Sequence, residues 1–106
     1  MSAWIYLFVA ALFEVGWPVG FKIAAMSLHK IIWICFSALA MTLSGVFLYL
    51  AQKQIPIGTA YAIWSGIGAS CTFLIGVLLF HDEINVMRIA GIIFIIVGLI
   101  LLKLGD

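Results

Sequence analysis

A single acidic residue interrupts the first long apolar run of the sequence. Glu14 stands near the centre of residues 3–26, where Lys22 is the other charged residue. A carboxylate at the depth of a lipid bilayer is costly, so it faces a water-filled cavity or a partner, or it stays protonated. A direct pair with Lys22 does not fit, because eight helical residues separate the two by about 12 Å. Glu14 is therefore predicted to bind protons and organic cations in turn.

Aromatic residues with helical spacing can complete a cation site around this carboxylate. Trp17 follows Glu14 by three positions, which places both on one face of a helix. Tyr61 and Trp64 have the same spacing in the third apolar run. Tryptophans also anchor helices at membrane surfaces, but Trp17 lies too deep in its run for that role. Because aromatic rings attract planar or quaternary cations, these residues predict a box for an organic cation.

Two further residues near this face have open interpretations. Ser44, in the second apolar run, can hold the Glu14 carboxylate by a hydrogen bond, or it can bond to its own helix backbone. Pro18 lacks the N–H that would donate to the carbonyl of Glu14, so a kink or a freed acceptor is expected there. That acceptor either binds water or substrate, or the kink is tolerated without a role.

Charged residues divide the chain into four apolar runs. Hydrophobic residues make up 67% of the 106 residues and charged residues 8%, so a soluble fold would leave much apolar surface in water. Because a helix needs about 20 residues to cross the hydrocarbon layer, the sequence predicts an all-α membrane protein of four transmembrane helices. We expect a single domain, residues 1–106, with helices over residues 3–26, 31–51, 59–80 and 86–104.

The fourth run is the shortest, and it has two interpretations. Only 14 uncharged residues separate Arg88 from Lys103. The run is either an interfacial segment or a spanning helix whose Arg88 and Lys103 side chains reach the two membrane surfaces. We favour the spanning helix.

The basic residues and the glycines of the fourth run favour a partner subunit. Lys22, Lys30 and Arg88 fall on one side of the membrane, against Lys53 and Lys103 on the other. This bias is weak by the positive-inside rule, so the chain can insert both ways and form an antiparallel dimer. Gly91 and Gly98 are seven residues apart, which is typical of a close helix–helix contact. Exposure of these glycines to lipid is the alternative.

Several classes of function lack support in the sequence. His29 and His81 are isolated in expected loops, and no residues have the spacing of a metal site or of a nucleophile with its base. Cys35 and Cys71 lie inside apolar runs, as small packing residues do. The net charge of +1 gives no basic patch for nucleic acid. We therefore expect no enzyme, cofactor or metal.

The motifs around Glu14 carry a resemblance to a known family. Residues 14–17 (EVGW), Phe21 with Lys22, and residues 56–68 (PIGTAYAIWSGIG) resemble the small multidrug resistance family. The resemblance covers essentially the whole chain. It implies an antiparallel homodimer, with Glu14 as the shared proton- and substrate-binding residue. It also implies that the residues surrounding the substrate are Trp17, Ser44, Tyr61 and Trp64. The implied dimer contact is formed by Gly91 and Gly98.

The resemblance extends to one branch of that family. One branch exports bulky quaternary ammonium compounds and another exports guanidinium. Features that resemble the guanidinium branch are Trp17, residues 58–62 (GTAYA), Gly68 with Ala69, and Leu102 with Lys103. The implied function is proton-coupled export of guanidinium and small substituted guanidinium cations across the bacterial inner membrane.

Three alternatives to this function stay open. Pro18, Gly20, Ser65 and the acidic pair Asp82-Glu83 depart from the branch pattern, so the cavity can be looser than in a strict guanidinium exporter. A broad exporter of quaternary ammonium and other hydrophobic cations is the first alternative. A non-transporting membrane subunit is the second, and a heterodimer with a related chain is the third.

Overall fold

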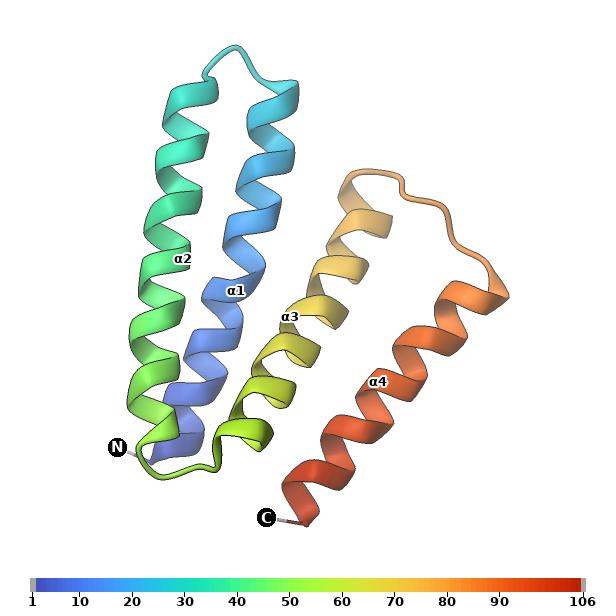
Figure 1. The fold of residues 1–106 in the computed structure, drawn as a ribbon. Helices are drawn as coiled ribbons and strands as arrows, with labels where there is room; N and C mark the ends of the chain where they lie inside the picture. Colours follow the sequence, from blue (N-terminus) through green and yellow to red (C-terminus); the bar gives the residue numbers. More distant parts are fainter. Residues whose placement is uncertain (1, 106) are drawn as a thin grey trace.

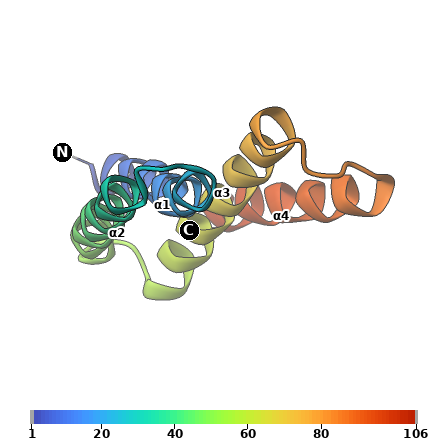
Figure 2. The same ribbon diagram turned by 90° about the horizontal axis from the view of Figure 1, so that it is seen from above.

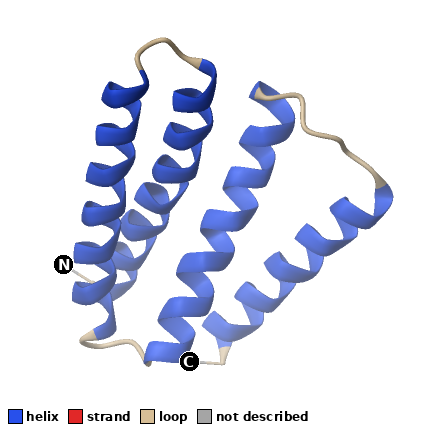
Figure 3. Cartoon of the chain, turned by 45° about the horizontal axis from the view of Figure 1, so that its top comes forward, coloured by secondary structure: helices blue, strands red, loops and turns tan. Residues whose placement is uncertain are grey.

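The computed structural model describes residues 2–105 and contains four helices in these residues, with no strand among them (Figures 1 and 3). Their bounds are α1 (Ala3–Met26), α2 (Lys30–Gln52), α3 (Ile57–Leu79) and α4 (Val86–Leu104). All four are long and apolar enough to cross a membrane, including α4 with 19 residues. The predicted all-α fold with four transmembrane helices is confirmed, and so is the spanning interpretation of the fourth run.

Local chemistry explains where the helices begin and end. The Ser2 side chain accepts a hydrogen bond from the Trp4 N–H, and the Asn85 side chain accepts one from the Arg88 N–H at 2.9 Å. Such caps satisfy N–H groups that have no partner inside the helix. α3 begins directly after Pro56, two residues earlier than expected, because the fixed φ of proline suits a helix start. α3 ends at Leu79, and His81 then adopts a left-handed φ of 57° that turns the chain.

The helices differ in how closely they pack (Figures 1 and 2). α1 and α2 run antiparallel along most of their lengths, α3 packs against α1, and α4 packs mainly on α3. α3 and α4 diverge toward the loop that joins them (Figure 1). The basic residues at the two ends of α4 lie over aromatic rings, Arg88 over Phe73 at 5.4 Å and Lys103 over Trp4 at 4.3 Å.

The buried core is concentrated where α1 begins, α2 ends and α3 begins. Its residues are mostly small or branched, which lets helix backbones approach closely in a membrane. We call them the core cluster: Ala3, Leu7, Ala51, Ile55, Ala60 and Ile63. Gly66 on α3 receives the Leu99 side chain of α4, since a Cβ on Gly66 would come 2.5 Å from Leu99 Cδ2.

α4 presents an open face that includes its two internal glycines. None of its residues is buried, and no atom lies within 4 Å of a Cβ position on Gly91 or Gly98 in the described part of the chain. The close helix–helix contact expected at these glycines is therefore not made within one chain. Their contact with a second subunit stays a prediction.

Candidate proton- and cation-binding site

Glu14 lies half-buried between α1 and α3, against a glycine. A Cβ added to Gly68 would come 2.5 Å from Glu14 Cγ and 3.2 Å from Glu14 Cβ. No side chain fits at position 68 unless Glu14 moves. Gly68 therefore makes room for the carboxylate at the point where α3 crosses α1. From the sequence, Gly68 was noted in the resemblance to the guanidinium branch, and its contact with Glu14 was missed because the register between two helices is not visible in one sequence.

Trp17 holds the Glu14 carboxylate directly. Its indole Nε1 donates a hydrogen bond to Glu14 Oε1, which the three-residue spacing on α1 makes possible. The Trp17 ring also meets Phe21 edge to face, with ring centroids 5.9 Å apart. Glu14 Oε2 has no hydrogen-bond partner among residues 2–105. One carboxylate oxygen is thus oriented by the protein and can still accept one more hydrogen bond, and the other oxygen is free to bind a ligand.

A cavity of about 190 Å³ opens beside this pair. Its lining comes from α1 and α3, and the residues are Glu14, Trp17, Pro18, Ser65, Gly68, Ala69 and Thr72. Ser65 donates its hydroxyl proton to the Tyr61 carbonyl at 2.7 Å, which leaves its oxygen able to accept a further hydrogen bond. Ser65 and Thr72 were not predicted as site residues. Each lies one helical turn after a residue of the resemblance, Tyr61 or Gly68, and Ser65 was noted as a departure from the branch pattern, but these signals were too weak to place either residue in the site.

Ser44 and Trp64 form a second polar contact, one turn away from Glu14 along α1. The Ser44 hydroxyl is buried, donates to the Ala10 carbonyl at 2.7 Å, and accepts from Trp64 Nε1 at 2.8 Å. A serine has one hydroxyl proton, so this bond replaces the expected one to the Glu14 carboxylate. Ser44 therefore ties α1, α2 and α3 together, and its place in the substrate surround stays a prediction.

Tyr61 lies at the edge of this arrangement. Its ring packs edge to face on Trp64, with centroids 5.4 Å apart, and its side chain is half-exposed. It does not line the Glu14 cavity. Neither Tyr61 nor Trp64 lines the cavity, and Trp64 bonds to Ser44 instead. Of the predicted surround, Trp17 is the residue that bonds to the carboxylate in the described part of the chain.

In residues 2–105, the site shows neither an ion pair to Glu14 nor a set of metal ligands. No ion pair joins Glu14 to Lys22 in the described chain, in agreement with their separation along α1. No group of three or more histidine, cysteine, aspartate or glutamate residues between Ser2 and Gly105 could hold a metal ion. The arrangement can instead bind a small cation at a carboxylate, beside an indole ring and hydroxyl oxygens.

The site lies in a sequence that matches a known family. A profile described as Small Multidrug Resistance protein matches residues 2–95. The chain belongs to the small multidrug resistance family. Together with the four spanning helices, this membership makes it a multi-pass protein of the bacterial inner membrane.

Relatives within the family are similar over nearly their whole length. A protein of Proteus vulgaris named guanidinium exporter is 40% identical over 104 residues, 98% of this chain and 99% of that protein. The guanidinium exporter of Escherichia coli K12 is 39% identical over 97% of both chains. A Bacillus licheniformis protein named probable guanidinium efflux system subunit GdnC is 38% identical over 95% of this chain and 89% of its own.

Proposed function

We propose that this protein is a proton-coupled antiporter that exports guanidinium and small substituted guanidinium cations. The observation that carries the proposal is the hydrogen bond from Trp17 Nε1 to Glu14 Oε1 beside a cavity between α1 and α3. This hydrogen bond orients the Glu14 carboxylate beside an aromatic ring, where a ligand in the cavity can reach it. The names of the similar exporters support the same substrate class.

The shape and polarity of the cavity suit guanidinium. This ion is planar, carries a fork of N–H donors and binds a carboxylate with two parallel hydrogen bonds. Glu14 supplies the carboxylate, and Ser65 and Thr72 supply hydroxyl oxygens along the lining. The volume of about 190 Å³ in each chain is below the roughly 300–1,000 Å³ typical of sites for drug-sized ligands. A quaternary ammonium ion has no N–H groups for these acceptors.

Exchange follows from a shared site. A proton on Glu14 removes the negative charge that attracts the cation, so proton and cation occupy the carboxylate in alternation. Two chains in an antiparallel homodimer would place two Glu14 residues near the membrane midplane, and rocking of the assembly would expose them to each side in turn. The inward proton gradient would then drive cation efflux. The open face of α4 with Gly91 and Gly98 supports a second chain at that position.

The test is transport by purified protein in liposomes. We expect guanidinium to drive proton exchange in the native protein, and Glu14→Gln to abolish it, because glutamine keeps the size of the side chain but cannot take up a proton. Currents on a solid-supported membrane with guanidinium, methylguanidinium and tetraphenylphosphonium measure both rate and selectivity. Coupled flux that persists in Glu14→Gln contradicts the proposal.

The panel also separates the alternatives. A larger current with tetraphenylphosphonium than with guanidinium would indicate a broad multidrug exporter. Absence of current with every cation would indicate a non-transporting subunit or a missing partner chain. Transport by the chain expressed and purified alone would support the homodimer.

A further inference from the structure

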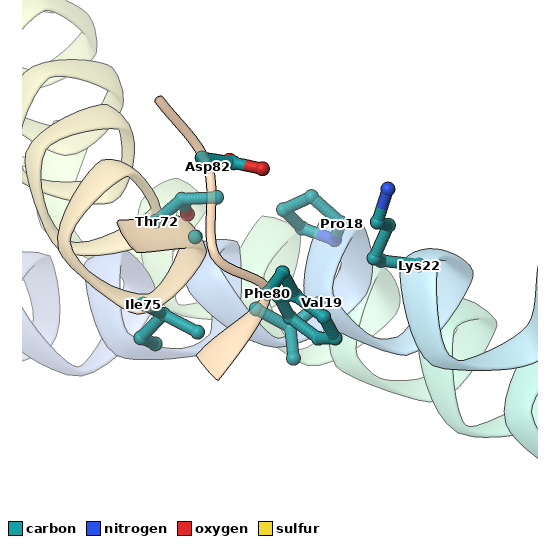
Figure 4. A pocket seen from close by; sticks show the side chains of 8 residues that line it. Pro18, Val19, Lys22, Thr72, Ile75, Phe80 and Asp82 are labelled. Atoms are coloured by element: carbon teal, nitrogen blue, oxygen red, sulfur yellow. The ribbon is translucent and has the colours of Figure 1, made fainter. Parts of the chain in front are cut away.

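A second cavity lies on the membrane-surface side of the Glu14 cavity. Its volume is about 170 Å³, and it opens between the second half of α1 and the end of α3 (Figure 4). Pro18 and Thr72 line both cavities, so the two are neighbours along the same groove. Charged residues from two elements line the second one: Lys22 from α1 and Asp82 from the loop after α3 (Figure 4). We call it the entrance cavity.

Asp82 is an exposed residue, but the loop places its carboxylate against helix α3. Asp82 Oδ2 occupies the space that a Cβ on Gly76 would fill, and Asp82 Cγ lies 3.2 Å from that position. The backbone N–H of Asp82 donates to the Gly76 carbonyl at 3.0 Å, and the left-handed φ of His81 folds the chain back over α3. The carboxylate is thus packed into a notch that only glycine provides.

This placement favours a cation beside Asp82. The C-terminal end of a helix carries partial negative charge from its free carbonyl groups, so an acidic side chain there is repelled. The described chain shows no ion pair between Asp82 and Lys22, although both line the cavity. Phe80 adds an aromatic ring to the lining. A carboxylate, helix carbonyls and an aromatic ring together favour a small organic cation.

From this geometry we propose that Asp82 is the carboxylate of a second cation-binding site, which holds a guanidinium-type ion at the membrane surface before it reaches Glu14. The inference rests on the proposed function, since it takes the same substrate class. Lys22 lines the same cavity without pairing with Asp82, so its positive charge opposes the binding of a second cation there. In the antiparallel homodimer proposed above the two chains point in opposite directions, so one entrance site lies at each membrane surface.

The first experiment compares two neighbouring acidic residues in liposomes. Asp82→Asn keeps the size of the side chain and removes its charge, and we expect the KM for guanidinium to rise roughly two- to fivefold at unchanged maximal current, as for one partly exposed charge contact. Glu83→Gln is the matched control, because Glu83 is exposed like Asp82 but does not line the entrance cavity. Lys22→Gln should lower the KM. Equal effects of Asp82→Asn and Glu83→Gln would reduce the result to surface charge and overturn the site.

A fourth variant distinguishes a binding site at Asp82 from a general effect of its negative charge. Gly76→Ala keeps Asp82 but adds the Cβ that displaces its carboxylate, and alanine is well tolerated in a helix. We expect it to raise the KM as Asp82→Asn does. A normal KM in Gly76→Ala overturns the proposed geometry.

Binding is measured apart from transport. In the Glu14→Gln protein, guanidinium should still shift the Asp82 amide signal in an NMR titration, and Glu14→Gln with Asp82→Asn should abolish the shift. No shift in Glu14→Gln overturns the entrance site. Failure of Glu14→Gln to stop coupled transport would count against the proposed function instead, so the two failures are distinguishable.

Discussion

The two halves of the α1–α3 contact are built in opposite ways. Near the start of α1 the helices meet through the core cluster, where Leu7 and Ala60 are fully buried. Further along, the same helices are separated by the Glu14 cavity and then by the entrance cavity. We call these the core half and the cavity half. Direct apolar contact stabilises the first, whereas the second keeps space and polar groups that cost stability.

The difference shows how a small membrane protein can hold a carboxylate. Packing in lipid depends on close contact between helices and on satisfied polar groups. The core half supplies the contact, with small residues such as Ala3 and Ala51 on facing helices. This leaves the cavity half free to present Glu14 to a ligand. Changes in the core half should therefore alter stability, and changes in the cavity half should alter transport.

Filling the notch at Gly68 should give the largest effect on transport. Gly68→Ala puts a Cβ 2.5 Å from Glu14 Cγ, so the carboxylate must leave its position beside Trp17. A misplacement of about 1 Å at a reacting group can lower rates on the order of 100-fold, and we expect guanidinium current to fall by about that factor. Gly58→Ala is the control on the same helix, because no atom lies within 4 Å of its Cβ position. Equal currents in the two variants would contradict the role of Gly68.

The fold and half of this site could be predicted from the sequence. Four uninterrupted apolar runs are long enough to span a membrane, so the helices followed from composition and length. The contact of Glu14 with Trp17 followed from spacing within one helix. Contacts between helices did not follow, because they depend on register. Thus Gly68 was placed on the correct helix but without its neighbour. The hydrogen bond of Ser44 was left open between Glu14 and its own helix, whereas it goes to Ala10 on α1.

The positions of the charged loop residues could not be predicted from the sequence either. Asp82 and Glu83 are adjacent acids in the sequence, and only one of them lines a cavity. Asp82 directly follows His81, whose left-handed φ turns the chain at this point. That conformation is uncommon for a residue other than glycine, so spacing alone gave no reason to choose Asp82.

Shortening a buried side chain in the core half should lower stability without a matching loss of transport. Leu7→Ala removes a fully buried side chain from the core cluster, and we expect a loss of about 2–3 kcal/mol in the free energy of unfolding. Unfolding in detergent, followed by circular dichroism, measures this change. Leu12→Ala is the control, since Leu12 is 67% exposed toward the lipid. Current per folded protein should stay close to the native value. A specific loss of transport in Leu7→Ala would contradict the claim that the core half sets stability and the cavity half sets transport.

The smallest expected effect concerns the choice between cations at the carboxylate itself. Trp17→Phe keeps an aromatic ring in the cavity but removes the N–H that orients Glu14 Oε1. Guanidinium depends on a fixed carboxylate because its N–H groups must meet both oxygens, whereas tetraphenylphosphonium has no N–H group to align. The ratio of guanidinium to tetraphenylphosphonium current should therefore fall roughly two- to tenfold, as for the loss of one hydrogen bond. Trp33→Phe, outside the cavity, should leave the ratio unchanged. An unchanged ratio in Trp17→Phe would mean that the ring alone sets selectivity, and the cavity half would then recognise its ligand by shape rather than by an oriented carboxylate.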